Sequence, residues 1–368
     1  MDRNQLTDNM KIHRTFPAAV SITAMILASC GNSQAPQFGE SLPRVDTPES
    51  IQQAVDAVLA GDKADDSVKF ESIMILKHGN VVYENWFGWR IRKLDDKPHA
   101  MHSVSKSFTA TAVGMAVDEG LLKVTDKLVD FFPEQLPEEV SDNLKAVTVH
   151  DLLTMNCGHE TECQRGDDWV TSFLAHPVTK TPGTWFCYNS MGTYMLSAIV
   201  QKLTGEKVVD YLDSRLFQPL HIQKPEWQES PQGINAGGWG MFITTEDMAK
   251  FGQLFLQKGE WNGKQLISKE WVAEASKYQV PSVPAGSRPD NVAEKGLTQE
   301  NCTFMLGYGY QMWMCPEGAF RADGARGQYI MIYPDADAVI AVTADSANLQ
   351  AEQDLIYQYL FPAVKGLR

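Results

Sequence analysis

The sequence has no low-complexity tract, no internal repeat and no CxxC-type cysteine spacing. Without cysteine pairs at metal-binding spacing, a zinc site is not expected, and we expect no metal. Excess positive charge is also missing, because 32 Lys and Arg oppose 46 Asp and Glu, giving a formal net charge of −14. Binding a phosphate backbone requires a basic face, so nucleic acid is not an expected partner.

The apolar run at residues 16–27 is too short to span a bilayer as a stable anchor. It follows two basic residues and precedes Leu-Ala-Ser-Cys at residues 27–30, a pattern typical of a secretory signal. Because it ends on Cys30, it resembles a bacterial lipoprotein signal; a plain signal peptide with an incidental cysteine is the alternative. We therefore expect residues 1–30 to be a signal with its lipobox. The protein would be exported and held by lipid on Cys30 at a bacterial membrane, on its periplasmic or cell-surface side and possibly at the outer membrane.

The chain of 368 residues fits one large domain or two closely packed ones. Residues 31–48 are rich in Pro, Gln, Ser and Gly, which predicts a tether. Residues 49–368 are expected to form one folded unit. Its α/β part would comprise about 49–100 and 300–368, and a mostly helical part would comprise about 101–299.

Helical apolar spacing and β-branched or aromatic runs between turn residues predict the elements of this unit. An early hairpin and three late strands, separated by a helical middle, predict an α+β fold, an α/β sandwich. Its antiparallel sheet would be built from both chain ends and flanked by helices. The expected helices are 50–59, 103–119, 149–155, 191–203, 208–216, 244–257 and 348–361, and the expected strands are 72–77, 81–87, 307–314, 328–333 and 338–344.

Five cysteines follow Cys30, and an odd number cannot all pair within the chain. An oxidising compartment would permit disulfides. Cys157 with Cys163 and Cys302 with Cys315 are the pairs closest in sequence, and the pairing stays open.

Ser103 and Lys106 stand three residues apart at the start of the expected helix 103–119. A serine hydroxyl needs a neighbouring base, and a buried lysine held neutral can serve as one. Positions i and i+3 share a helix face, and free N–H groups at a helix start can stabilise an oxyanion. Chance alone gives about one Ser-x-x-Lys pair in such a chain, so the pair by itself is weak evidence. Ser105 and Ser107 lack a matching lysine and are assigned supporting or surface roles.

Residues 101–108, Met-His-Ser-Val-Ser-Lys-Ser-Phe, resemble the Ser-x-x-Lys helix start of the serine β-lactamase and penicillin-binding protein superfamily. Residues 182–192 resemble the Pro-Gly, aromatic, Tyr-x-Asn/Ser segment of its class C and esterase branches. Further matches at 150–159, 237–251 and 307–328 follow in the family's order. The nearest branch is that of the β-lactamase-related esterases and amide hydrolases, which include the 6-aminohexanoate-dimer hydrolases. The implied fold is β-lactamase/transpeptidase-like.

The resemblance implies a role for each matching residue. Ser103 would attack the substrate carbonyl and become acylated, and Lys106 and Tyr188 would share the proton transfers. Which of the two is the base stays open. Ser190 would bond Lys106 or the substrate, and the backbone N–H groups of Ser103 and Gln328 would form the oxyanion hole.

The sequence departs from the family in its late-strand triad, usually Lys or His, then Thr or Ser, then Gly. The nearest stretch is Ala325-Arg326-Gly327, so support for a substrate carboxylate is absent or is moved to the guanidinium of Arg326. Trp239 and Tyr308 are candidates for an acyl pocket, with core packing as the alternative. His159 and Glu160 are interpreted as a loop histidine and a solvated glutamate rather than a metal or base pair.

These features predict a serine hydrolase that cleaves ester or amide bonds of small molecules through an acyl-enzyme on Ser103, without a cofactor. A β-lactamase or a D-amino-acid peptidase acting on cell-wall peptides is the first alternative. A non-catalytic, lipid-anchored binding protein is the second. The physiological substrate and the oligomeric state stay open.

Overall fold

A computed structural model of the chain describes residues 36–88 and 97–367. The expected signal with Cys30 and residues 31–35 of the expected tether lie outside the described residues. Within these two ranges, every helix is too short or too polar to cross a membrane.

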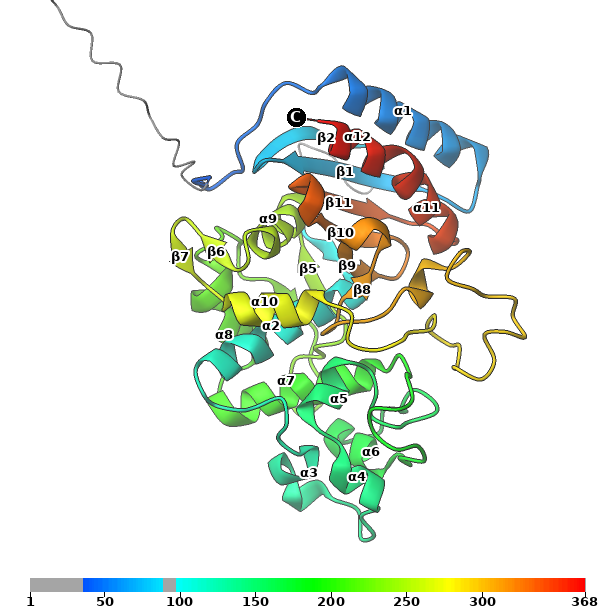
Figure 1. The fold of residues 1–368 in the computed structure, drawn as a ribbon. Helices are drawn as coiled ribbons and strands as arrows, with labels where there is room; N and C mark the ends of the chain where they lie inside the picture. The colour runs from blue at the N-terminus through cyan, green and yellow to red at the C-terminus, as the bar shows by residue number, and fades with distance from the viewer. Residues whose placement is uncertain (1–35, 89–96, 368) are drawn as a thin grey trace, which may run out of the picture. The chain divides into compact units, whose positions relative to one another are not determined.

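A six-stranded antiparallel sheet lies at the centre of the fold, in the order β2-β1-β11-β10-β9-β8 (Figure 1). The first two strands come from the start of the described chain, and the other four come from its last sixty residues. Ile75 of β1 lies opposite Ile340 of β11, so an early and a late segment of the described chain pair within the sheet. The predicted α+β fold is therefore confirmed. The strands are β1 (Phe70–Lys77), β2 (Asn80–Trp86), β8 (Trp313–Met314), β9 (Phe320–Gly324), β10 (Gln328–Tyr333) and β11 (Ala338–Ala344).

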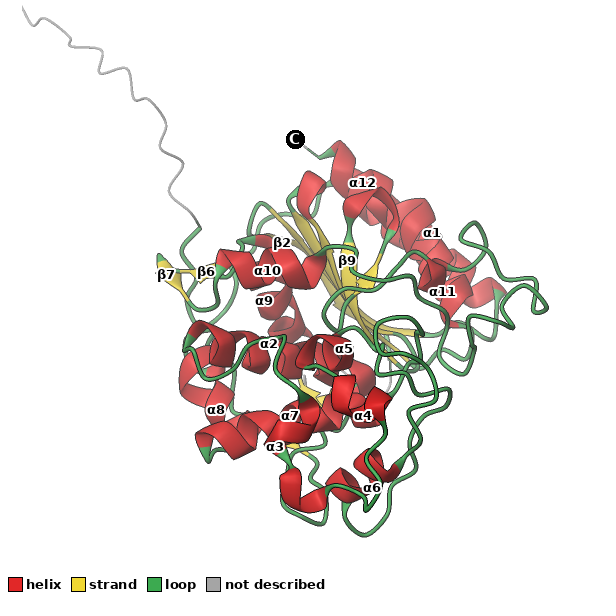
Figure 2. Ribbon diagram, turned by 60° about the horizontal axis from the view of Figure 1, so that its bottom comes forward, coloured by secondary structure: helices red, strands yellow, loops and turns green. Residues whose placement is uncertain are grey.

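Helices cover both faces of the sheet (Figures 1 and 2). On one face, α1 (Glu49–Ala64), α11 (Leu349–Leu355) and α12 (Phe361–Gly366) bury a cluster that includes Val55 and Ile356. On the other face, α9 (Thr245–Leu256) packs against β10 and β11. This approach needs Gly252, because a Cβ atom there would lie 2.5 Å from the side chain of Val339.

The remaining helices form the layer below α9 in Figure 1. Their starts are explained by capping: the Thr148 and Asp151 side chains close a capping box at α5, and Asn189 caps α7. Gly205, in the left-handed conformation, ends α7. These elements are α2 (Ser105–Asp118), α3 (Leu128–Phe131), α4 (Asp142–Ala146), α5 (Val149–Leu153), α6 (Trp169–Ala175), α7 (Ser190–Thr204), α8 (Val208–Leu212) and α10 (Lys269–Ser276), with the short strands β3 (His99–Ala100), β4 (Glu226–Trp227), β5 (Met241–Ile243), β6 (Glu260–Trp261) and β7 (Lys264–Gln265).

The late strands are predicted unevenly. The ranges 328–333 and 338–344 are confirmed as β10 and β11. The expected strand 307–314 is wrong except for β8, because positive φ angles at Gly307 (120°) and Gln311 (57°) fold the segment into turns. Strand β9 is missed, since its Arg321 and Asp323 do not show the apolar alternation of a strand; they are buried as an ion pair instead.

The described part of the segment expected as a tether, residues 36–48, lies on the folded body. The ring of Phe38 stacks on Trp261 with centroids 4.3 Å apart, and the Asn262 side chain bonds both the N–H and the C=O of Phe38. Further along, Arg44 forms ion pairs with Glu84 and Glu246. Apolar and polar contacts together therefore fix this stretch against the β6–β7 hairpin and α9.

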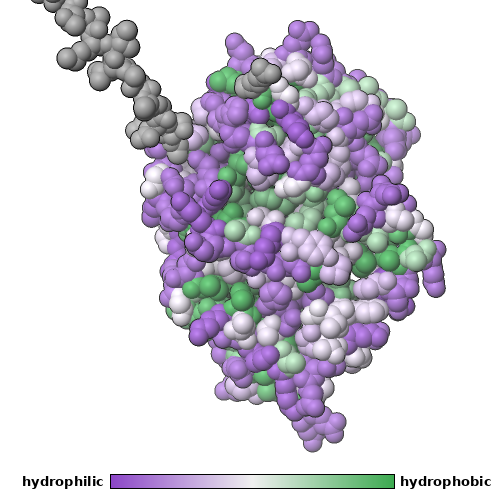
Figure 3. All heavy atoms as spheres, viewed as in Figure 1, coloured by the Kyte–Doolittle hydropathy of each residue, from purple (hydrophilic) through white to green (hydrophobic). Residues whose placement is uncertain are grey.

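All five cysteines after Cys30 are free thiols in the structure. The two disulfides considered from sequence spacing are not formed. On the face seen in Figure 3, apolar residues form small patches separated by polar side chains.

Candidate active site

Ser103 lies in a single 3₁₀ turn, His102–Val104, that leads directly into α2. The turn is tightly held: Ser105 donates its hydroxyl to the carbonyl of His102 (2.7 Å) and accepts from the N–H of Met241 (3.2 Å). His102 itself has φ 48°, a conformation uncommon outside glycine. The backbone before Ser103 is therefore fixed in a sharp bend that presents the side chain at the start of the helix.

Lys106 is buried and makes three polar contacts through its Nζ atom. It lies 2.8 Å from Oγ of Ser103, 3.2 Å from Oγ of Ser190 and 2.7 Å from the carbonyl oxygen of Gly238. A Cβ atom at Gly238 would lie 2.7 Å from the backbone oxygen of Ser190, so the carbonyl can sit here only because residue 238 is glycine. The predicted meeting of Ser103, Lys106 and Ser190 is observed.

Burial lowers the pKa of Lys106 to about 7 from its usual value of 10.5. The nearby charges of Glu162 and Asp323 act in the opposite direction. A lysine with this pKa is substantially neutral near pH 7, and a neutral amine can accept the proton of a serine hydroxyl.

Tyr188 lies beside this pair. Nζ of Lys106 is 4.9 Å from the centre of its ring, and its hydroxyl is hydrogen-bonded to the Ser103 side chain. Burial raises the pKa of Tyr188 well above its usual value, while the bond to Ser103 lowers it. Tyr188 therefore starts as a neutral phenol that can pass on a proton. Its ring stacks on Trp313 with centroids 5.4 Å apart.

His159 supports this region rather than acting in it. It is buried, and its Nδ1 atom lies 3.1 Å from Nδ2 of Asn189, the residue that caps α7. Burial lowers its pKa to about 3, so it is neutral at ordinary pH. Glu160 bonds Thr179 and Lys180 at the surface.

A cavity of about 230 Å³ opens beside Ser103 and Tyr188. Its wall is mostly apolar, with one carboxyl group, Asp323. That carboxylate accepts a 2.8 Å hydrogen bond from Nε of Arg321 and a 3.3 Å bond from Nε2 of Gln353, both on Oδ2. The lining residues are Ser103, Tyr188, Pro284, Ala285, Phe304, Trp313, Asp323, Ala325 and Leu349.

The structure does not bring Gln328, Arg326 and Gly327 into this cavity. The Gln328 side chain and the exposed, Asp345-paired Arg326 line a separate hollow with His99. Gly327, at φ 92°, leaves room for the carboxyl group of Glu352. The stretch Ala325-Arg326-Gly327, which was compared with the late-strand triad, does not lie on a strand. It forms the bend that follows β9. On the strand, Gly324 allows the close approach to the Ser103 turn, since a Cβ atom there would lie 2.4 Å from the oxygen of Met101.

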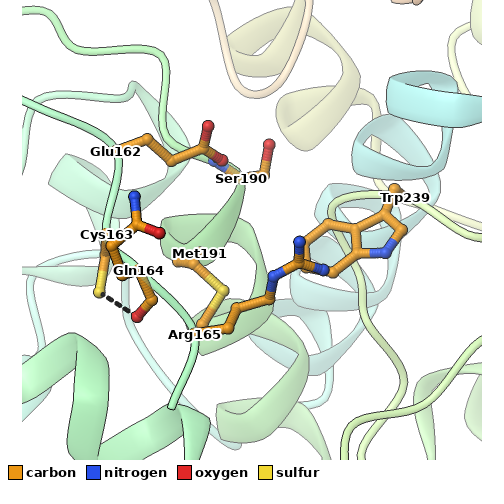
Figure 4. A pocket seen from close by; sticks show the side chains of 7 residues that line it. All are labelled: Glu162, Cys163, Gln164, Arg165, Ser190, Met191 and Trp239. Carbon is orange, nitrogen blue, oxygen red and sulfur yellow. Dashed lines mark hydrogen bonds between the residues drawn. The ribbon is translucent and has the colours of Figure 1, made fainter.

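Trp239 and Tyr308 have different surroundings. Tyr308 is fully buried against Trp313 and the edge of Tyr188, so it packs behind the site. Trp239 lines a second hollow of about 390 Å³, shown in Figure 4, which also includes Ser190, the residue whose hydroxyl contacts Lys106. Its other lining residues are Glu162, Cys163, Gln164, Arg165 and Met191.

Sequence reasoning missed three groups that adjoin the cluster, the carbonyl of Gly238, Asp323 and Glu162, and it also missed Arg165 in the neighbouring hollow. The first is a main-chain atom, which no side-chain motif reveals. Glu162 accepts a 3.0 Å bond from the N–H of Ser190 at the start of α7. Across residues 36–88 and 97–367, no group of three or more His, Cys, Asp and Glu side chains is arranged to hold a metal.

Known proteins resemble this chain over most of its length. A family model described as Beta-lactamase matches residues 56–363. A 6-aminohexanoate-dimer hydrolase from Paenarthrobacter ureafaciens is 26% identical over 293 residues, which cover 73% of this chain and 71% of that protein. A β-lactamase of Escherichia coli (strain K12) is 23% identical over 292 residues, 71% of this chain and 73% of that one. A provisionally named 6-aminohexanoate-dimer hydrolase from Bacillus anthracis superposes with a TM-score of 0.70 at 19% identity, covering 88% and 87% of the two chains, and so shares the fold.

Proposed function

The chain belongs to the β-lactamase family, and from that premise we propose that it is a serine hydrolase that cleaves esters or amides of small molecules through an acyl-enzyme on Ser103. The observation that carries the proposal is the contact between Ser103 and Lys106, at 2.8 Å, with the pKa of the lysine near 7. A serine and a lysine paired only by chance would not also place the amine where burial keeps it neutral.

In the proposed mechanism, the Ser103 hydroxyl loses its proton to Lys106 or Tyr188 as Oγ bonds the substrate carbonyl carbon. The oxygen of that carbonyl becomes an oxyanion. The backbone N–H groups of Ser103 and Ala325 are its proposed donors, because both residues line the cavity and neither N–H is bonded to another described residue. Tyr188 or Lys106 then returns the proton to the leaving oxygen or nitrogen as its bond to carbon breaks.

Water completes the cycle by attacking the acyl carbon. The same basic group takes a proton from the water, the bond from Oγ to carbon breaks, and Ser103 recovers its proton. This step needs no group beyond the three side chains already in contact.

The charge of the cavity favours esters and open amides over β-lactams. The usual family triad places a cation near the substrate carboxylate, whereas the strand beside this cavity carries Asp323. Its partner Arg321 is fully buried behind it. A substrate carboxylate beside β9 would therefore face the carboxyl group of Asp323, and this contact is unfavourable.

The test is turnover of 4-nitrophenyl acetate by the purified protein. We expect a burst of 4-nitrophenol equal to the enzyme present, followed by slower turnover, and no burst in Ser103→Ala. Ser214→Ala, which removes an exposed hydroxyl, is the matched control and should behave as wild type. Unchanged turnover in Ser103→Ala would refute the proposal. Rapid nitrocefin cleavage would favour the β-lactamase alternative, and failure of a fluorophosphonate to label Ser103 would favour the binding protein.

We also propose export and lipid anchoring through Cys30, on the sequence pattern of residues 11–30 alone. Expressed in a bacterium that processes lipoproteins, the full chain should label with a palmitate probe and fractionate with membranes. Cys30→Ser should abolish the label, and an equal label in that variant would refute the anchor.

A further inference from the structure

Arg165 is solvent-exposed and projects into the hollow of Figure 4, where its guanidinium lies against aromatic rings. The carbon at the centre of its guanidinium lies 5.1 Å from the centre of the Trp239 ring and 5.6 Å from that of Trp169. The two indoles contact each other at 5.6 Å, so the arginine rests on an aromatic pair. No hydrogen bond or ion pair joins it to another residue in the described ranges. Stacking fixes the plane of a guanidinium while leaving its edge free.

The hollow leads from Arg165 to the catalytic cluster. Ser190 lines it, and the same hydroxyl lies 3.2 Å from Nζ of Lys106. A substrate whose carbonyl is at Ser103 can therefore extend past Ser190 toward Arg165.

The charge in the hollow limits what can bind there. Besides Arg165, its only charged side chain is Glu162, which is bonded to the N–H of Ser190 at the other side. A single negative charge beside Arg165 is favourable, whereas a second one would meet repulsion from Glu162. A planar carboxylate also matches the paired donors of a guanidinium edge.

We propose that this hollow is a subsite for a substrate carboxylate, and that Arg165, held by Trp169 and Trp239, is the residue that selects it. The carboxylate recognition considered for Arg326 is thereby assigned to a different hollow. This inference rests on the proposed hydrolase function and names the class of substrate: esters or amides whose chain carries one terminal carboxylate.

The test compares two substrate pairs, and in each pair a carboxylate is replaced by its methyl ester. One pair is the mono-4-nitrophenyl ester of glutaric acid and its methyl ester, with the carboxylate on the acyl side. The other is 4-acetoxybenzoate and its methyl ester, with the carboxylate on the leaving group. In at least one pair, Arg165→Gln should lower kcat/KM for the anion about tenfold, mainly through KM, and leave the neutral ester within about twofold.

Arg165→Lys should recover only part of the loss, because it restores the charge and not the paired donors. Lys264→Gln, which removes one positive charge from the exposed β7 strand, is the control. In both pairs it should leave unchanged the ratio of kcat/KM for the anion to kcat/KM for the neutral ester. Equal effects of Arg165→Gln on the anion and the neutral ester in both pairs would overturn the inference. If the neutral esters are still cleaved in a Ser103-dependent manner, only the inference fails; if Ser103→Ala cleaves them as well as wild type, the proposed function fails.

Discussion

The carbonyl oxygen of Gly238 lies 2.7 Å from Nζ of Lys106 and accepts a hydrogen bond from it. A carbonyl can only accept, so this contact takes one N–H of the lysine whatever its charge. The other two contacts of Nζ are serine hydroxyls, which can donate as well as accept. When the amine is neutral, its lone pair can therefore turn only toward Ser103 or Ser190. The glycine carbonyl restricts the direction from which Lys106 can take a proton.

The pH dependence of ester hydrolysis should follow Lys106. Because the pKa of this lysine is about 7 and only the neutral amine is a base, kcat/KM should rise with pH through a single ionisation near 7. The measurement is kcat/KM for a neutral 4-nitrophenyl ester between pH 5 and 9. Tyr188→Phe should be slower by a factor of about 100 or more while keeping the same midpoint. A flat profile in wild type would show that Lys106 is not the titrating base.

Replacing Gly238 by alanine should disturb the site without touching a catalytic side chain. The new Cβ would lie 2.7 Å from the oxygen of Ser190, so the backbone must move and carry the carbonyl away from Lys106. We expect kcat/KM to fall at least tenfold and the free energy of unfolding to fall by about 1–3 kcal/mol. Gly366→Ala, whose Cβ would meet no atom within 4 Å, is the matched control. Wild-type kinetics in Gly238→Ala would show that the carbonyl contact is dispensable.

Glu352 should make the protein less stable as the pH rises. Burial raises the pKa of its carboxyl group well above the usual value of 4.5, so above that pH the unfolded chain loses this proton while the folded one keeps it. The resulting loss of free energy of unfolding is absent below pH 4.5 and grows with pH until the carboxyl group ionises in the folded protein. Urea unfolding of Glu352→Gln should therefore show a gain over wild type that increases from pH 4 to pH 8. The exposed Glu138→Gln should show no such trend, and a constant difference for Glu352→Gln would contradict the explanation.

A chain that begins at residue 49 should be less stable than one that begins at residue 36. The shorter chain loses Phe38, which stacks on Trp261, and Leu42, which is buried. Removing a buried aromatic side chain costs about 3–5 kcal/mol. The urea midpoints of the two chains are the measurement. Equal midpoints would mean that residues 36–48 contribute nothing to the fold and act as a tether after all.

The sequence predicted the parts of the fold whose signal is local. Strands β10 and β11 are continuous apolar runs between turn residues, and both were located within their true bounds. Strand β9 was missed because its polar side chains are buried by mutual pairing of Arg321 and Asp323, a contact that composition does not reveal.

The same limit applies to the site. Ser103, Lys106 and Tyr188 were brought together by motif, and the structure places them in contact. The roles expected of Arg326 and Gln328 stay predictions; their side chains line a separate hollow, whereas Asp323 and Ala325 line the cavity beside Ser103, a difference that only the pairing of β9 with β10 reveals. Arg165 carries no motif, and the role proposed for it depends on its contacts with Trp169 and the distant Trp239.

The pairing of β1 with β11 also constrains how the molecule can fold. Residues 70–77 pair with β2 on one side, but on the other side their partners lie at 338–344, so the β1–β11 pair cannot form until nearly the whole chain is available. Closing so long a loop is entropically slow, and until then β1 has an unsatisfied edge. A chain that stops short of β11 would keep an apolar strand open to other chains. We therefore expect the C-terminal segment that carries β11 to protect the chain from aggregation during synthesis, in addition to completing the sheet.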